Sequence, residues 1–222
     1  MLIDLHVHSC YSKDSLSRPK ELIAWMQRRG LDRIAITDHD AIEGALQAAR
    51  LAPEAIIVGE EIRTLCGEII GLFLREFVPP GRTPEETIAD IHAQEGLVYV
   101  PHPMDRLRGS TLSPRALARV ASEIDIVEAY NSRVMRPQCN RAARGWAEER
   151  GLPLGAGSDA HRARDIGLAT VEVPEFIDAQ GLLHALKYGR IRGRLTGPCG
   201  RLSALRARIA KRAAGVGEEQ AR

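Results

Sequence analysis

Histidines and carboxylates recur along the chain in short motifs whose side chains could bind divalent metal ions. The motifs are HVH (His6, His8), SKD (Asp14), TDH (His39), GEE (Glu61), HP (His102) and SDAH (Asp159, His161). Imidazole and carboxylate donors together suit Zn²⁺, Mn²⁺ or Fe²⁺, and the four cysteines stand outside the pattern. Each motif alone is weak evidence, because a single histidine is more often structural or solvated than a ligand. The joint pattern nevertheless indicates a metal site.

The elements that must position these side chains are short apolar runs. Such runs predict strands at Leu2–His8, Arg33–Thr37, Ile56–Ile62, Glu68–Leu74, Leu97–Val100, Ile124–Ala129 and Leu154–Ala156. Nearly every candidate ligand lies at the C-terminal end of one of these strands. The i, i+2 spacing of His6 and His8 also places both imidazoles on one face of their strand. In a (β/α) barrel these strand ends form the rim that carries the site, so the ligands are expected to meet there.

Amphipathic segments separate most of the strands and predict helices near 19–30, 41–51, 84–95, 114–121 and 136–150. Three of them follow helix-start signals, which are Ser17 with Pro19, Thr83-Pro84 with Glu86, and Ser113-Pro114. Only the pair 56–62 and 68–74 lacks an intervening helix and resembles a hairpin. Repeated βα units with buried strands predict an α/β fold whose parallel sheet is either closed into a barrel or open and doubly wound.

Composition excludes several classes of protein. A chain of 222 residues with 44% hydrophobic and 27% charged residues suits one globular core. The longest apolar runs fall far short of the roughly 18 residues that a membrane span needs. The N-terminus shows no leader pattern, and the cysteines form no C-x-x-C pair, so we expect reduced thiols in a cytoplasmic protein. The net charge of +2 is too small to argue for a nucleic-acid partner.

The order HxH, Asp14, TDH, GxE, HP, SDxH resembles the PHP (polymerase and histidinol phosphatase) family, over Leu2 to about Leu168. The resemblance implies a distorted (β/α)7 barrel with its metal site at the C-terminal rim of the strands. We therefore expect a metal-dependent hydrolase domain at 1–200, followed by a basic helix and a frayed tail at 201–222.

The resemblance also implies two to three divalent metal ions, Mn²⁺, Zn²⁺ or Fe²⁺. One ion would be bound by His6, His8, Glu61 and Asp159, and a second by Asp14, His39 and His161. Glu61 would bridge to a third ion shared with His102. Asp159 and His161 are the residues expected to be essential for catalysis as well as for metal binding.

One position departs from the commonest family pattern, in which a second histidine stands on the strand after the glutamate. This chain has Glu68 there, which would replace an imidazole with a harder carboxylate donor. The alternative is that Glu68 faces solvent and the third ion is weakly bound or absent. Glu60 should point to the opposite face of its strand from Glu61, while Asp38 and Asp40 are candidates for orienting His39 or capping the next helix.

The predicted activity is hydrolysis of a phosphate ester, most simply a small phosphomonoester, by a metal-bridged hydroxide. Four carboxylates (Asp14, Glu61, Glu68, Asp159) facing three divalent cations leave the cluster net positive, which favours an anionic substrate. Arg106 and Arg133, in the loops expected around the site, are the predicted substrate-binding cations.

Two other functions remain open. The same cluster could hydrolyse a C–N bond, as related metal barrels open amides, or the domain could bind metal without catalysis. A nucleic-acid substrate is possible but not favoured, because the 33 residues between Glu68 and His102 leave no room for a covering domain. The expected partner is a small phosphorylated substrate, with no membrane association. The pattern does not determine the physiological substrate, the native metal or the oligomeric state.

Overall fold

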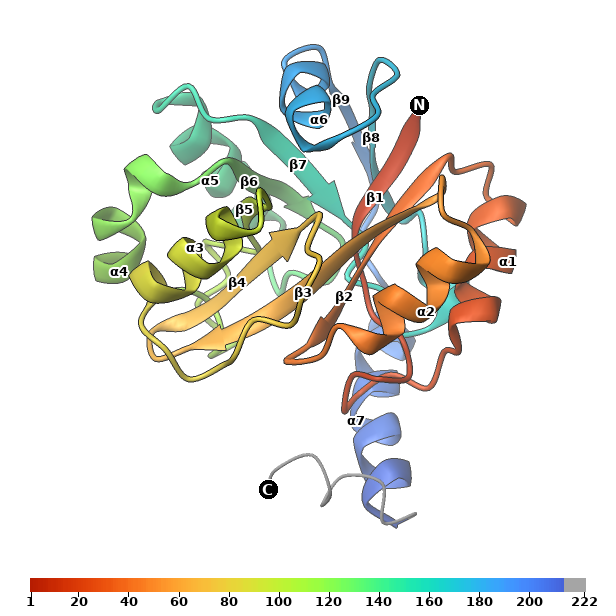
Figure 1. The fold of residues 1–222 in the computed structure, drawn as a ribbon. Coiled ribbons are helices and arrows are strands. Elements are labelled where there is room, and N and C mark those ends of the chain that lie inside the picture. Colours follow the sequence, from red (N-terminus) through yellow and green to blue (C-terminus); the bar gives the residue numbers. More distant parts are fainter. Residues whose placement is uncertain (214–222) are drawn as a thin grey trace.

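The computed structural model describes residues 1–213, with the backbone alone for 198–203. Its strands are β1 (Leu2–Val7), β2 (Arg33–His39), β3 (Ile56–Thr64), β4 (Gly67–Leu72), β5 (Leu97–Val100), β6 (Ile126–Asn131), β7 (Leu154–Gly157), β8 (Ala169–Glu172) and β9 (Arg190–Gly193). Its helices are α1 (Pro19–Arg28), α2 (Glu43–Leu51), α3 (Pro84–Ala93), α4 (Pro114–Arg119), α5 (Pro137–Glu148), α6 (Ala179–Leu186) and α7 (Pro198–Ala213), with short 3₁₀ turns at Ala121–Glu123 and Ala163–Asp165 (Figure 1).

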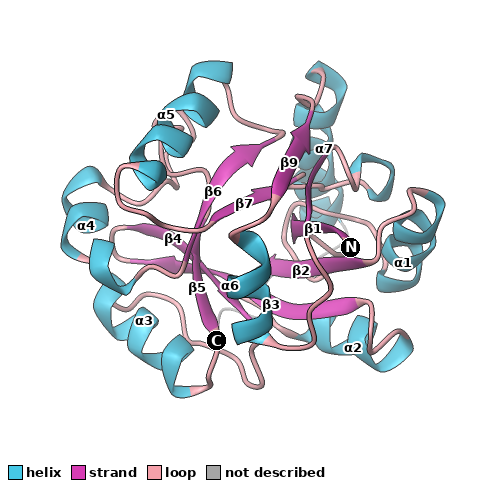
Figure 2. Cartoon of the chain, turned by 90° about the horizontal axis from the view of Figure 1, so that it is seen from above, coloured by secondary structure: helices cyan, strands magenta, loops and turns pink. Residues whose placement is uncertain are grey.

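The strands form one sheet in the order β7-β6-β5-β4-β3-β2-β1-β8-β9. Neighbours are parallel except around β4 and at β8 and β9, where they pair antiparallel. The sheet curls until the end of β1 meets the segment after β7, where Val7 bridges Ala160 and the amide of Asp159 donates to the carbonyl of His6 at 2.8 Å. Helices surround the strands, as Figure 2 shows from above. The expected distorted barrel is confirmed, and the open, doubly wound alternative is wrong.

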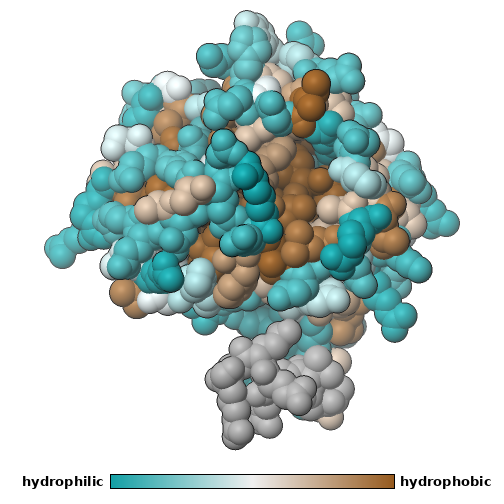
Figure 3. All heavy atoms as spheres, viewed as in Figure 1, coloured by the Kyte–Doolittle hydropathy of each residue, from teal (hydrophilic) through white to brown (hydrophobic). Residues whose placement is uncertain are grey.

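Apolar side chains on the helices and strands explain this arrangement. Helix α3 buries Ile88 and Ile91 one turn apart, and it begins with the expected capping box, in which Thr83 and Glu86 exchange hydrogen bonds. Inside the barrel, the fully buried Tyr99 and Leu5 belong to a cluster that continues to α6. On the face of Figure 3 an apolar band reaches the surface and is bordered by hydrophilic side chains.

The hairpin predicted between the third and fourth strands is present, with Glu61 paired to Ile70 and Thr64 to Gly67. Gly67 has a φ of +129°, and a Cβ there would lie 2.4 Å from the backbone of Leu112, so only glycine fits the turn. The hairpin replaces a βα unit and thus reverses the direction of one strand in the barrel.

The structure differs from the prediction mainly near the C-terminus. Strands β8 and β9 and helix α6 were not predicted, and α7 begins at Pro198 instead of residue 201. The predicted frayed tail at 214–222 lies outside the described residues. Ser17 does not cap α1, because its Oγ accepts a hydrogen bond from the amide of Ala163. Among the described residues, no helix is long and apolar enough to cross a membrane.

Candidate metal centre

His6 and His8 bring two imidazole nitrogens together at the end of β1. Both side chains are fully buried, and their Nε2 atoms lie 3.0 Å apart. The Nδ1 of His6 donates to Glu128 Oε1 at 2.9 Å. The Nδ1 of His8 lies 3.1 Å from Ser12 Oγ, which gives its own proton to Asp38 and therefore accepts from His8. With both Nδ1 atoms protonated, two Nε2 lone pairs face each other.

Glu61, at the end of β3, stands at the centre of the cluster. Its Oε2 lies 3.3 Å from the Nε2 of His6 and of His8, and 3.2 Å from Nδ1 of His39. Its Oε1 lies 3.1 Å from Nε2 of His102. Four histidines, two from the strands β1 and β2 and two from the segments that follow β1 and β5, thus surround a single carboxylate, so the predicted motifs meet at one rim of the barrel.

Asp159, His161 and Asp14 extend the cluster toward the loops after β7 and β1. Asp159 Oδ1 lies 3.5 Å from His8 Nε2. Asp14 Oδ1 lies 3.3 Å from His161 Nε2, and Asp14 Oδ2 lies 3.8 Å from His39 Nε2. The i, i+2 pair Asp159 and His161 therefore reaches two different parts of the cluster.

The backbone around these ligands takes conformations that are unusual for residues with side chains. His102 has a φ of +33° and Asp159 a φ of +53°, both in the left-handed region. Gly157 lies beside the cluster, where a Cβ would come within 2.2 Å of the Cβ of His6. Such strain persists only when the surrounding structure holds it, and it is common at functional sites.

Two arginines reach the cluster from outside the predicted ligand set. Arg108 Nη1 donates to Asp159 Oδ2 at 2.5 Å, and Arg133 Nη1 lies 3.4 Å from Asp159 Oδ1 and also contacts His161 Nδ1. Their side chains are only 20% and 13% exposed. Arg133 was predicted at the site, whereas Arg106, the other predicted substrate-binding residue, is exposed and does not line the cleft beside the cluster. The loop after β5 presents Arg108 in its place.

A layer of polar residues behind the cluster was not predicted. Glu128, on β6, also accepts from the amide of His102 at 2.6 Å and from Asn131 Nδ2 at 2.9 Å. Asn131 in turn donates to Asp159 Oδ2 at 3.2 Å. Such partners orient ligating histidines and fix their tautomers. The E-A-Y-N spacing on a strand was the only local signal for this pair.

The carboxylates beside the motifs have other roles. Asp38 accepts from the hydroxyls of Ser9 and Ser12. The Oγ of Ser12 in turn accepts from Nδ1 of His8 and from the backbone amide of His39, so Asp38 supports both histidines through Ser12. Asp40 accepts from the amide of Arg63 and does not cap α2. Glu60 points away from Glu61, as predicted: it is buried on the other side of β3, where it accepts from the amide of Val78.

Comparison of the sequence with known proteins identifies the family of this chain. The model of the PHP domain matches residues 4–109, and the PHP-associated model matches residues 137–191. An uncharacterized protein of Methanocaldococcus jannaschii is 34% identical over 200 residues, which cover 84% of this chain and 79% of that protein. A second one is 40% identical over 144 residues, covering 59% and 84%. This chain belongs to the PHP family.

Solved structures agree on the fold. A two-domain protein from Bacteroides vulgatus containing a predicted PHP-like metal-dependent phosphoesterase has a TM-score of 0.69 at 20% identity, over 95% of this chain and 69% of that chain. An amidohydrolase from Chromobacterium violaceum with bound sulfate has a TM-score of 0.61 at 19% identity, over 86% and 97%. At these identities the likeness establishes the barrel and not the substrate.

Glu68, the departure from the commonest PHP pattern, turns inward. It is 4% exposed, and its carboxylate oxygens lie 3.6 Å from His39 Nδ1 and 3.9 Å from His102 Nε2. Its Oε2 accepts no hydrogen bond from the described residues. The solvent-facing alternative is therefore wrong, and Glu68 is available as a ligand.

Charges in the cluster shift the pKa values of its members. Burial disfavours the charged form of His6, yet Glu128 and Glu61 raise its pKa well above the usual value. Burial lowers the pKa of His39 to about 3, against the opposing pull of Glu61. Burial, together with Arg133, lowers the pKa of His161 to about 4. Burial and the charge of Glu61 raise the pKa of Glu68 to about 8. Burial disfavours the charged form of Glu61, yet the surrounding histidines lower its pKa well below the usual value, so in the metal-free cluster its charge opposes the ionisation of Glu68.

The donor set fits divalent cations. Three groups of ligand atoms lie close enough to share an ion: His6, His8 and Glu61; His8, His39 and His161; and His39, Glu61 and Glu68. The facing lone pairs of His6 and His8 require a proton or a cation between them, and the unsatisfied Glu68 oxygen requires a donor or a cation. Family membership and this donor set support a metal-dependent hydrolase.

Proposed function

We propose that this protein is a metal-dependent phosphoesterase that hydrolyses a small phosphomonoester. The observation that carries the proposal is the placing of Arg108 and Arg133 at Asp159, a carboxylate of the metal cluster. Guanidinium groups match the geometry and charge of phosphate oxygens, and they gain strength where water is partly excluded. A neutral amide would make little use of two such cations.

Two groups of residues would have different roles, binding of the cations and binding of the phosphate. His6, His8, His39, His102, His161 and the carboxylates of Asp14, Glu61, Glu68 and Asp159 would hold two to three divalent cations. When bound, such cations lower the pKa of water and stabilise charge on phosphoryl oxygens. Arg108 and Arg133 would hold the phosphate against the cluster and stabilise the negative charge that develops during the reaction.

His39 and His161 act as lone-pair donors more than as proton donors. With pKa values of about 3 and about 4, His39 and His161 are neutral at pH 7. A neutral imidazole can donate a lone pair to a cation but carries no spare proton for a leaving group. We therefore assign the predicted catalytic role of His161, and of Asp159 beside it, to binding cations and positioning the phosphate.

The surroundings of the cluster favour a small, polar substrate. The cluster opens into a cleft of about 1010 Å³, and no Phe, Tyr or Trp lines it in the described part of the chain. Bases of nucleic acids usually stack on such side chains. Between β4 and β5 the chain contains only the loop 73–83 and α3 before the next turn, so no further domain covers the cleft from there. A nucleic-acid substrate is thus not favoured.

The test is a panel of phosphomonoesters, phosphodiesters and cyclic amides, offered to purified protein loaded with Mn²⁺, Zn²⁺ or Fe²⁺. We expect release of inorganic phosphate from at least one monoester. Asp159→Ala and His161→Ala should each lower that rate by about 10² or more while the fold is retained. Hydrolysis of an amide without any phosphate release would refute the proposal in favour of C–N hydrolysis. Inactivity of fully metal-loaded protein on the whole panel would favour a non-catalytic metal-binding domain.

A further inference from the structure

One face of α7 packs against the barrel beside the metal centre. Ala204 and Ala207 are buried, and Arg208 and Lys211 follow at the positions i+4 and i+7 from Ala204, so the four share a face of the helix. Arg208 and Lys211 both contact the segment after β1, so this face of the helix is turned toward the barrel. Figure 1 shows α7, in blue, extending downward from the barrel past the red loop that follows β1, although the two segments are far apart in the sequence.

Lys211 fastens α7 to the loop that carries Asp14. Its Nζ donates to the carbonyl oxygens of Cys10 and Ser12, and its side chain is partly buried. Burial lowers the pKa of the Lys211 ammonium. These bonds join the C-terminal helix to the segment between the HxH motif and Asp14, which fixes the position of Arg208 one helical turn earlier.

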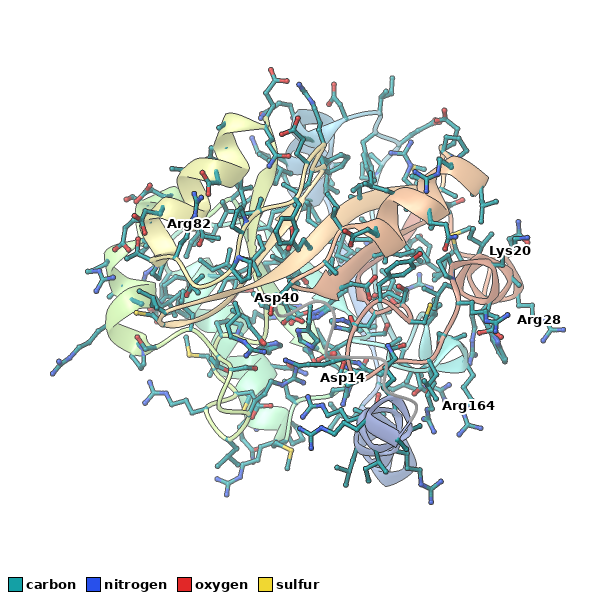
Figure 4. The ribbon with its side chains drawn as sticks, turned by 60° about the horizontal axis from the view of Figure 1, so that its bottom comes forward. Asp14, Lys20, Arg28, Asp40, Arg82 and Arg164 are labelled. Atoms are coloured by element: carbon teal, nitrogen blue, oxygen red, sulfur yellow. The ribbon has the colours of Figure 1, made fainter. Side chains whose placement is uncertain are left out.

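Arg208 points from α7 to the metal centre. Its Nη2 donates to Asp14 Oδ2 at 2.7 Å, and its side chain is half exposed. Figure 4 shows Asp14 between the barrel and α7. Within the described part of the chain, Asp14 is the hydrogen-bond partner of Arg208, and the half-exposed guanidinium has further N–H groups with which it can bind a second acceptor in the cleft.

Arg208 is one of several basic residues that line the cleft. Arg108 and Arg133 lie deep in it, while Lys13, Arg63 and Arg208 line its outer part. Lys13 is exposed, and Arg63 is 53% exposed, with a guanidinium nitrogen 3.9 Å from Asp40. Arg108 and Arg133 can bind the oxygens of a substrate phosphate deep in the cleft. The outer cations can bind anionic oxygens of the same substrate that lie too far out for these two arginines.

We propose that Arg208 binds an anionic group of the substrate, so that α7 is part of the substrate site. The inference rests on the proposed function, since it assigns a residue to recognition of the same phosphorylated substrate. Arg208 lies outside both stretches matched by the family models, residues 4–109 and 137–191. It would therefore be a feature of this chain's C-terminal helix, added to the common barrel.

The test measures the affinity of inorganic phosphate for the full-length, Mn²⁺-loaded protein by titration calorimetry. Arg208→Gln should weaken phosphate binding about tenfold, because one partly exposed charge-assisted hydrogen bond contributes about that factor to the affinity. Arg208→Lys should restore part of the loss, because it keeps the charge without the planar fork. Arg206→Gln removes the same charge from an exposed position of α7 outside the cleft, and it should leave the affinity unchanged. Thermal unfolding and metal content of each variant accompany the titration.

Each result separates this inference from the proposed function. Phosphate affinity that is equal in wild type and Arg208→Gln, or undetectable in the wild type, would overturn the role of Arg208. Higher Mn²⁺ content in Arg208→Gln with unchanged phosphate affinity would show that Arg208 only neutralises Asp14, which overturns it equally. An Arg208-dependent phosphate site in a protein that hydrolyses no phosphoester would leave the inference standing as an anion site and refute the proposed reaction. If the protein is an active phosphoesterase and its KM and phosphate affinity are the same in wild type and Arg208→Gln, the proposed reaction stands and the role of Arg208 is refuted.

Discussion

Arg108 Nη1 lies 2.5 Å from Oδ2 of Asp159, and this contact joins the loop after β5 to the loop after β7 across the mouth of the barrel. The two residues are 51 positions apart in the chain. The partly buried guanidinium balances the charge of a carboxylate in the metal cluster and faces the cleft.

Replacing Arg108 should therefore impair turnover of the phosphate ester more than folding. We expect Arg108→Gln to lower kcat/KM about 10²-fold, the usual cost of losing one charged group that stabilises a developing charge. Arg106→Gln, which removes the same charge two residues earlier at an exposed position, should keep near-normal kinetics. Equal losses in the two variants would mean that general surface charge, and not the Asp159 contact, attracts the substrate.

Removing the metals should destabilise the protein. Purified protein should carry two to three divalent ions, and a chelator should abolish activity reversibly. Ions that bind only the folded state contribute about 2.7 kcal/mol when present at a hundred times their Kd, so chelation should lower Tm by several degrees. His6→Ala should show less bound metal and a smaller response to the chelator. Elemental analysis that finds no metal after Mn²⁺, Zn²⁺ or Fe²⁺ supplementation would contradict the metal centre.

Glu128 should tune metal affinity without touching the metal. Glu128→Gln keeps the shape and an acceptor for His6 Nδ1 but removes the charge. We expect metal affinity to fall about 10- to 100-fold, the usual effect of losing a carboxylate behind a ligating histidine. The measurement is competition with a coloured chelator. Glu123→Gln, the same change at an exposed site, is the control. Unchanged affinity in Glu128→Gln would limit Glu128 to a structural role.

The carboxylate of Glu68 should decide the metal preference. Glu68→His supplies a softer, neutral donor and should favour Zn²⁺ over Mn²⁺, while Glu68→Gln should lower occupancy of the ion nearest Glu61 and His102. Metal stoichiometry and activation by each ion in the wild type and both variants provide the test. If stoichiometry and rates stay the same in Glu68→Gln, the centre is better described with two ions than with three.

Glu60 should make stability fall with pH. Burial raises its pKa to about 8 from an ordinary value of 4.5, so between these values the folded state holds a proton that the unfolded state releases. Stability then decreases as pH rises through this window, by up to about 1.4 kcal/mol per pH unit, and the loss is complete above pH 8. Glu60→Gln should remove this loss while keeping an acceptor for Val78. Urea unfolding at pH 5, 7 and 9 should show the variant gaining relative to wild type as pH rises; a constant difference would contradict the raised pKa.

Local pattern was enough to predict much of this protein. Alternating apolar runs and helix caps located the first seven strands and five helices, with ends differing by a few residues. The helix-free hairpin at β3 and β4 followed from two apolar runs separated by a short turn. The candidate ligands could be recognised because the rim of a barrel gathers residues from successive strand ends, so position along the chain already predicts proximity.

Tertiary structure alone decided the remaining features. Strands β8 and β9 have four residues each, too few for a clear alternation; β8 forms because β1 offers it an edge, and β9 then pairs with β8. Whether Arg106 or Arg108 faces the cleft depends on the conformation of the loop after β5, which the hydrophobic periodicity of the sequence does not predict. The contacts of Glu128 with His6 and of Arg208 with Asp14 span 122 and 194 positions. Such pairs exist only once the barrel has closed and α7 has packed against it, because a hydrogen bond depends on distance in space, and spacing along the chain does not encode that distance beyond one element.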